Sequence, residues 1–136
     1  MGHGPFALGM LGAATMIVGK QQDVHALGLD PESTPEAYAD LVERHLGPDP
    51  REDTLLLVDM LGGTPANTAV LLCQKCGVQA VAGINLPLLM ELIMLRSEFG
   101  PGALVELAVG AAPATIVSLS ALVDRAQDTG HFGGVE

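Results

Sequence analysis

A continuous apolar run followed by a glycine turn and a helix is the feature that most constrains the fold of this 136-residue chain. Residues 54–59 read TLLLVD, and an apolar run of this kind bounded by charge predicts a strand covered on both faces. The residues that follow, MLGGTPANTAVLLCQKCG, predict a turn and then a helix that ends at Gly77, with Thr64 as its cap and Pro65 in its first turn. Because such a strand needs helices on either side, the sequence indicates an α/β fold.

Strand-like and helix-like segments alternate along the rest of the chain. We expect strands at 23–29 and 78–84, a final strand or strand-helix at 113–123, and helices at 5–19, 33–48, 86–100 and 101–112. Short crossovers through helices join parallel strands, so this order predicts a mainly parallel open sheet with helices on both faces. We place one domain at residues 1–125 and a polar, glycine-rich tail at 126–136.

Composition and cysteine usage exclude several classes of protein. The formal net charge is −10 and the six Lys and Arg residues are scattered, so nucleic-acid binding is not expected. No apolar stretch approaches the roughly 20 residues of a membrane helix, and the N-terminus lacks a secretion signal. Cys73 and Cys76 lie at the end of a predicted helix, and two ligands cannot complete a tetrahedral zinc site. We therefore expect neither a metal nor a cofactor.

Two helix starts carry the residues best suited to phosphate chemistry. In open α/β folds ligands bind beyond the carboxyl ends of the strands, which directs attention to GHGP and VDMLGGTP. Asp59 ends the most apolar strand, and Gly62 and Gly63 then lead to a helix start whose free N–H groups suit an anion. His3, followed by Gly4, precedes another helix. A neutral imidazole is a nucleophile, and a carboxylate on one ring nitrogen fixes the tautomer that leaves the other free.

Other interpretations of these segments remain open at this point. An Asp at a strand end is often a turn residue, and GGTP can be ordinary helix-start chemistry. The GK of MIVGKQQ fails as a phosphate loop because Ala14 replaces the first glycine and Gln21 replaces the magnesium-binding Ser or Thr. GHGPFA formally fits a dinucleotide fingerprint, with Asp23 or Asp30 as the ribose acid, so a nucleotide-binding α/β domain is one alternative.

Four segments together resemble the EIIA domain of the mannose family of the bacterial phosphoenolpyruvate-dependent sugar phosphotransferase system. They occur in the family's order and spacing, over about residues 3–125, and read HGPFALGMLGAATMIVG, GLDPESTPEAYADLVE, LLLVDMLGGTPANTA and VAGINLPLLMELIM. The resemblance implies a cytoplasmic phosphocarrier with a doubly wound parallel sheet. It also implies a homodimer that exchanges an antiparallel strand, which we place near Thr115 to Ser120.

The resemblance also implies roles for individual residues and partners. His3 matches the histidine that accepts a phosphoryl group from the histidine phosphocarrier protein HPr and passes it to an EIIB domain. EIIB then phosphorylates the sugar as it crosses the EIIC and EIID membrane components. Asp59 matches the aspartate that hydrogen-bonds Nδ1 so that Nε2 attacks, and Thr64 matches a Ser or Thr near the phosphate.

The chain departs from the family at its start. Family members begin with a central apolar strand of about half a dozen residues, of ordinary strand length, whereas only Met1 and Gly2 precede His3 here. Unless another segment fills that position, neighbouring strands keep unpaired backbone groups, and we expect weak stability and a badly positioned His3. A regulatory or interaction relative that carries no phosphate is therefore a further alternative.

Overall fold

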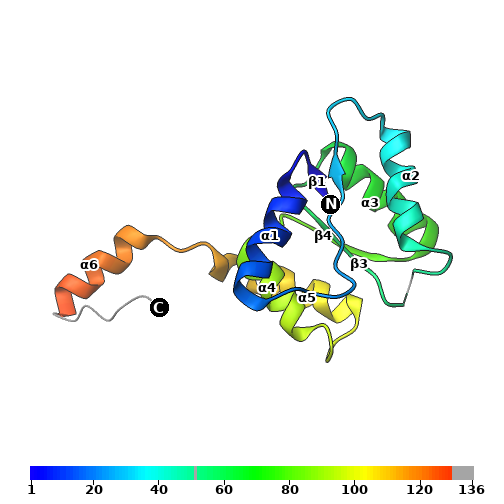
Figure 1. Cartoon of the computed structure of the whole chain (residues 1–136). Helices are drawn as coiled ribbons and strands as arrows, with labels where there is room; N and C mark the ends of the chain where they lie inside the picture. The colour runs from blue at the N-terminus through cyan, green and yellow to red at the C-terminus, as the bar shows by residue number, and fades with distance from the viewer. Residues whose placement is uncertain (51, 130–136) are drawn as a thin grey trace.

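Helices cover both sides of a set of short parallel strands in the computed structural model, which describes residues 1–50 and 52–129 (Figure 1). The strands are β1 (Gly2–His3), β2 (Gly28–Leu29), β3 (Leu55–Val58) and β4 (Gln79–Ala82). The helices are α1 (Phe6–Val18), α2 (Pro35–Leu46), α3 (Gly63–Cys76), α4 (Leu86–Leu95), α5 (Pro101–Ala111), the 3₁₀ helix η1 (Ala112–Thr115) and α6 (Leu119–Thr129). The predicted α/β class, with parallel strands and helices on both faces, is confirmed.

Met1 joins the strand pairs into one open arrangement. β1 pairs in parallel with β2, and β3 pairs in parallel with β4. Between the pairs, the Met1 ammonium donates to the Leu57 carbonyl at 2.7 Å and the Asp59 N–H donates to the Met1 carbonyl at 3.2 Å. The spatial order is therefore β2, β1, β3, β4, with the two-residue β1 in a central position.

Alternate side chains of β3 enter two separate hydrophobic cores. Leu56 and Val58 are buried among residues of α2 and α3, and Leu55 and Leu57 pack against the cluster formed by α1, α4 and α5. Successive side chains of a strand point to opposite faces, so a continuous apolar run is required when both faces are covered. The interpretation of TLLLVD as a doubly covered strand is confirmed.

Local capping signals set most helix starts. Thr34 caps α2 by accepting from the Ala37 N–H at 3.1 Å, and Asn85 caps α4 by accepting from the Leu88 N–H at 3.0 Å. The predicted cap of α3 is wrong: Gly62 is the capping residue, and Thr64 lies inside the helix without a capping side-chain bond. The chain turns at Gly62 with φ of 90°, a conformation that glycine adopts without strain, so the helix begins earlier than predicted.

The expected strand at 23–29 is formed only at its end, by β2. Residues 23–27 border a groove of about 690 Å³, which residues of β3 also line. His3 is held in place, as described below.

Beyond α5 the chain leaves the body of the molecule. Figure 1 shows α6 standing away from the other helices at the end of an extended connection. The expected exchanged strand is not paired here: Thr115 ends η1, residues 116–118 are extended, and Leu119 and Ser120 already belong to α6. No single helix among the described residues is long and apolar enough to cross a membrane; residues 101–115 and 119–128 together would be, but they are bent by 58°.

Candidate functional site

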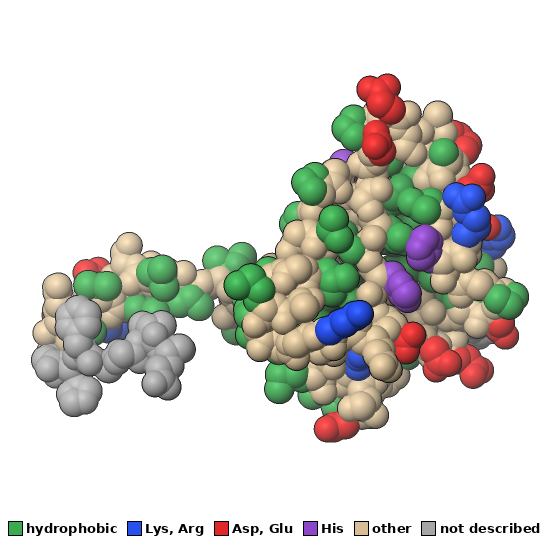
Figure 2. All heavy atoms as spheres, viewed as in Figure 1, with side chains coloured by type: hydrophobic (Ala, Val, Ile, Leu, Met, Phe, Trp, Pro, Cys, Tyr) green, Lys and Arg blue, Asp and Glu red, His purple; other side chains and the backbone are tan. Residues whose placement is uncertain are grey.

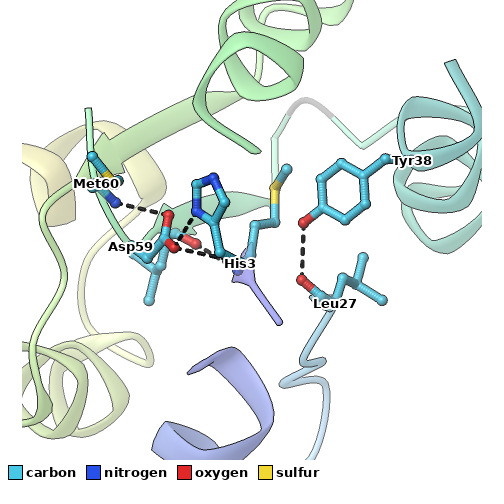
Figure 3. Close-up of polar contacts among 7 residues, drawn as sticks. His3, Leu27, Tyr38, Asp59 and Met60 are labelled. Carbon is cyan, nitrogen blue, oxygen red and sulfur yellow. Dashed lines mark hydrogen bonds and ion pairs between the residues drawn. The ribbon is translucent and has the colours of Figure 1, made fainter. Parts of the chain in front are cut away.

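His3 and Asp59 meet at the carboxyl edge of the strands, where β1 and β3 end side by side (Figure 3). His3 Nδ1 lies 2.7 Å from Asp59 Oδ2, and the same oxygen accepts from the His3 backbone N–H at 2.8 Å. The His3 side chain is 46% exposed, whereas the Asp59 side chain is 9% exposed. The imidazole therefore faces solvent while its partner is held in the protein.

Asp59 is fixed in its ionised form by several donors. Burial on its own would raise the pKa of Asp59, but hydrogen bonds from the backbone and ring of His3 and from the Met60 N–H outweigh it. The net result is a pKa below the ordinary value of 3.8. The Met60 N–H donates to Oδ1 at 2.8 Å, so both carboxylate oxygens are engaged. Because an ionised carboxylate only accepts, the neutral imidazole in this contact carries its proton on Nδ1 and its lone pair on Nε2.

Gly63 brings the start of α3 against the imidazole. A Cβ added at Gly63 would lie 2.8 Å from His3 Nε2 and 3.0 Å from Cε1, and Gly63 has a φ of 81°. A residue with a side chain would therefore displace the ring as well as strain the backbone. The backbone at the N-terminus of α3 is consequently adjacent to the nitrogen that is free to react, as an anion site at a helix start requires.

The remaining predicted site residues follow His3 in the sequence or lie at the start of α3. Gly4 follows His3 with a φ of 50°, and its N–H donates to the Leu29 carbonyl at 2.9 Å, so it turns the chain from β1 toward α1. Thr64 follows Gly63 in the first turn of α3 and is half-buried. Gly62 forms the turn with its φ of 90°, and a Cβ added there would meet no atom within 4 Å.

Sequence reasoning missed the residues that hold β1 in place. The Tyr38 hydroxyl donates to the Leu27 carbonyl at 2.9 Å (Figure 3). The same carbonyl accepts from the Gly2 N–H at 3.2 Å. The helical spacing of residues 33–48 gave no sign of the Tyr38 bond. Sequence reasoning also missed three exposed apolar side chains that lie within three residues of His3 or Asp59 in the chain, namely Phe6, Met60 and Leu61.

The other residues that the sequence analysis considered for metal or nucleotide binding lie away from His3 and Asp59. Cys73 and Cys76 are free and half-buried, and burial raises the pKa of the Cys73 thiol. Asp30 accepts from the Glu32 N–H at 2.9 Å within a turn. In the part of the chain that the structure describes, no group of three or more His, Cys, Asp or Glu side chains is arranged to hold a metal ion.

Sequence comparisons with known proteins agree with one another. The family described as "EIIA-man: PTS system fructose IIA component" matches residues 1–109. The PTS system fructose-specific EIIA component of Bacillus subtilis (strain 168) is 32% identical over 106 residues, which cover 71% of this chain and 68% of the relative. The PTS system mannose-specific EIIAB component of Escherichia coli (strain K12) is 32% identical over 98 residues, but the match spans only 30% of that longer protein.

Solved structures agree with the sequence matches. A phosphotransferase system component EIIA from Streptococcus agalactiae has a TM-score of 0.81 and 27% identity, covering 88% of this chain and 94% of that chain. A PTS IIA protein associated with the fucose utilization operon of Streptococcus pneumoniae has a TM-score of 0.76 and 29% identity, covering 90% and 91%. The predicted resemblance is confirmed, and this chain belongs to the EIIA-man family of phosphotransferase system components.

Proposed function

We propose that this chain is a phosphocarrier and that His3 Nε2 is the atom that accepts the phosphoryl group. The observation that supports this most strongly is the 2.7 Å contact of His3 Nδ1 with Asp59, which leaves Nε2 as the unprotonated nitrogen. In the transfer the Nε2 lone pair forms a bond to phosphorus while the bond from phosphorus to the donor imidazole breaks. The donor nitrogen recovers its electron pair, and the proton on Nδ1 stays against Asp59.

The surrounding backbone supplies the charge stabilisation that such a transfer needs. Phosphoryl transfer passes through a loose transition state, in which positioned donors matter more than covalent catalysis. We assign the phosphate-binding role to Gly4, Gly62, Gly63 and Thr64, because they lie at the turns beside His3 and at the N-terminus of α3. Free N–H groups at the start of α3, with the helix dipole behind them, offset the phosphoryl charge without a metal ion.

Membership of the family supports a proposal for the partners. We assign HPr as the phosphoryl donor and an EIIB domain as the acceptor, with the membrane components EIIC and EIID downstream, and a cytoplasmic location. One relative is named as an EIIAB component, in which an EIIA and an EIIB are parts of the same protein. Phe6, Met60 and Leu61 lie within three residues of His3 or Asp59 in the chain, and their exposed apolar side chains suit the docking of a partner that must exclude water from the reacting atoms.

We also assign residues 1–125 to the phosphocarrier domain and a homodimeric state to the chain. Ile116 is 83% exposed and Val117 is 55% exposed on the extended segment that leads away from the body (Figure 1). Exposed apolar residues on an extended segment are suited to pairing with a second copy. The dimer is therefore assigned to residues 116–118, and its test is given in the Discussion.

Phosphorylation in vitro tests the carrier function. The chain is incubated with phosphoenolpyruvate, enzyme I and HPr, and intact mass spectrometry is used to look for one acid-labile phosphoryl group. His3→Ala should abolish the adduct, whereas His25→Ala should leave it unchanged because His25 is exposed and has its ring contact with His45 instead. No adduct on the unaltered chain would favour the regulatory or interaction relative, and an adduct that survives His3→Ala would move the site elsewhere.

A further inference from the structure

Two thiols lie in the last turn of α3. Cys73 and Cys76 are three residues apart, and Cys76 is the final residue of the helix. The Gly77 N–H donates to the Cys73 carbonyl at 3.0 Å, so the turn that carries both thiols keeps its helical hydrogen bond. Side chains three residues apart are neighbours on a helix surface, with Cβ atoms about 5–6 Å apart. The two sulfur atoms can therefore bind one ion placed between them.

The thiols face the contact between α3 and α2. The two helices pack against each other (Figure 1), and both cysteines are half-buried against the hydrophobic core that residues of α2, α3 and β3 form. Both cysteines are free, and burial raises the pKa of the Cys73 thiol. Because a protonated thiol in apolar surroundings is a poor nucleophile, the pair is better suited to holding an ion than to thiol catalysis.

The number of available ligands selects the kind of ion. Among residues 1–50 and 52–129, no group of three or more His, Cys, Asp or Glu side chains could hold a metal ion, so the two thiols have no third ligand of these types. A structural zinc site needs four ligands. Thiolates are soft ligands that select Cu(I), and Cu(I) is stable between two thiolates in a near-linear arrangement. The pair therefore fits Cu(I) and not Zn²⁺.

A positive charge lies beside the thiols. One Cu(I) bound by two thiolates carries a net negative charge, and Lys75 stands between the two cysteines in the sequence. The Lys75 ammonium donates to both carboxylate oxygens of Glu43, at 2.9 and 3.0 Å. The pairing with Glu43 is the main cause of a raised pKa of Lys75, and the charge of Cys76 contributes to it. The ammonium is therefore close enough to Cys76 to offset part of the negative charge.

The surroundings of this ammonium are visible at the surface. Figure 2 shows Lys and Arg side chains lying beside Asp and Glu side chains at the right edge of the molecule, where Figure 1 places α2. The Lys75 side chain is 63% exposed, so water screens its charge and its contribution is small.

We propose that Cys73 and Cys76 bind one Cu(I) ion as a two-coordinate site at the C-terminal end of α3. On binding, each thiol releases its proton to water as its sulfur forms a bond to the ion. Copper keeps its oxidation state, so the step consumes neither an oxidant nor a reductant.

This site is independent of the proposed phosphoryl transfer. Gly63 lies beside His3 at one end of α3, and Cys76 lies at the other end. Because an α-helix rises 1.5 Å per residue, the two ends are about 20 Å apart. His3→Ala should therefore bind Cu(I) as the unaltered chain does, and a failure of copper binding would leave the phosphocarrier function untouched.

Competition for Cu(I) tests the proposal on the full 136-residue chain. The chain is titrated into the coloured complex of Cu(I) with bicinchoninate, in oxygen-free solution with ascorbate, and the loss of colour measures transfer of copper. Native mass spectrometry should show one copper per chain, and ultraviolet absorption should show a thiolate-to-copper charge-transfer band. Zn²⁺ should bind at least about a hundredfold more weakly, because two of its four ligands would be missing.

Variants in the last turn of α3 locate the ion. Cys73→Ser and Cys76→Ser should each weaken Cu(I) binding by more than about a hundredfold, since even groups behind a metal ligand contribute roughly 10- to 100-fold. Lys75→Gln should weaken it only about threefold, as expected for an exposed charge. Gln74→Ser changes an exposed residue of the same turn and should have no effect. Circular dichroism verifies that each variant is folded.

Thermal unfolding gives a second measurement that does not depend on the competitor. An ion that binds only the folded chain raises Tm, so Cu(I) should raise the Tm of the unaltered chain and of Gln74→Ser but not that of either serine variant at a cysteine. The proposal is wrong if copper stays with bicinchoninate, if either cysteine variant keeps full affinity, if Zn²⁺ binds as tightly, or if one ion is shared between two chains.

Discussion

At the scale of single residues, the pairing of His3 with Asp59 determines which ring nitrogen can react. Asp59→Asn keeps the size of the side chain but removes its charge, so the proton on Nδ1 loses the partner that holds it there. We expect the rate of phosphorylation by phospho-HPr to fall on the order of a hundredfold, the size of effect typical of a lost acid–base partner. Rapid-quench kinetics measure this rate. Asp40→Asn, an exposed carboxylate on α2, should leave it unchanged.

A second prediction at this scale concerns two neighbouring glycines. Gly62 and Gly63 both have positive φ, but only a Cβ on Gly63 would contact His3 Nε2, at 2.8 Å. Gly62→Ala and Gly63→Ala should each lower the free energy of unfolding by about 1–2 kcal/mol through backbone strain. Only Gly63→Ala should in addition slow phosphorylation, because it displaces the reacting ring. Equal rates for the two variants would show that the contact with Gly63 has no role in the reaction.

The contact between His3 and Asp59 was predicted from their positions at strand ends, and the structure confirms the contact. Asp59 and His3 lie where parallel strands finish, and the structure brings them together. Thr64 was wrongly predicted as a cap because positive φ at two successive glycines starts the helix earlier, and a sequence pattern does not encode that geometry. The role of Tyr38 was missed because its hydroxyl donates to a carbonyl outside its own helix, that of Leu27. Helical periodicity does not predict a bond of this kind.

At the scale of elements, β1 is stabilised by its surroundings rather than by its length. The Leu27 carbonyl accepts from both Gly2 and Tyr38, which connects α2 to the strand that carries His3. Tyr38→Phe should lower the free energy of unfolding by about 1 kcal/mol, the net contribution of one hydrogen bond. It should also slow phosphorylation slightly, because β1 is held less firmly. Urea unfolding at neutral pH measures the first effect.

The same tyrosine predicts a dependence of stability on alkaline pH. Burial raises the pKa of Tyr38 to about 12 from 10.0. The folded state therefore holds this proton more tightly than the unfolded state, so the stabilisation is complete below pH 10 and is lost as the pH rises toward 12. Tyr38→Phe should reduce the decline in that window. Tyr38 is the only tyrosine, so tyrosinate absorbance reports its titration directly, and an ordinary titration near pH 10 would contradict the prediction.

Helices and strands were predictable where the hydrophobic periodicity and the residues at the segment ends indicate the same element. The helices predicted at 33–48 and 86–100 begin in the structure at Pro35 and Leu86, and the alternation of β3 between two cores follows from its continuous apolar run. Of the strand expected at 23–29, only Gly28 and Leu29 pair, with Gly2 and His3. Residues 116–118 stay unpaired because their apolar side chains find no partner within the described part of this chain.

At the scale of the whole molecule, two cores on either side of β3 form one body, and α6 stands outside it (Figure 1). If residues 116–118 join two copies, Ile116→Lys should convert a dimer to a monomer, because it places a charge in an apolar contact. Val70→Lys changes an exposed apolar residue on α3 and should not. Light scattering measures the mass of each protein. A monomeric unaltered chain, or a dimer that persists in Ile116→Lys, would contradict this arrangement.

The regiochemistry of the phosphorylated histidine tests the central claim most directly. The chain is labelled with ¹⁵N, phosphorylated through enzyme I and HPr, and examined by nuclear magnetic resonance for coupling between phosphorus and the imidazole nitrogens of His3. Because Asp59 holds the proton on Nδ1, the account predicts phosphorus on Nε2 alone. Phosphorus on Nδ1, or on another residue, would contradict it.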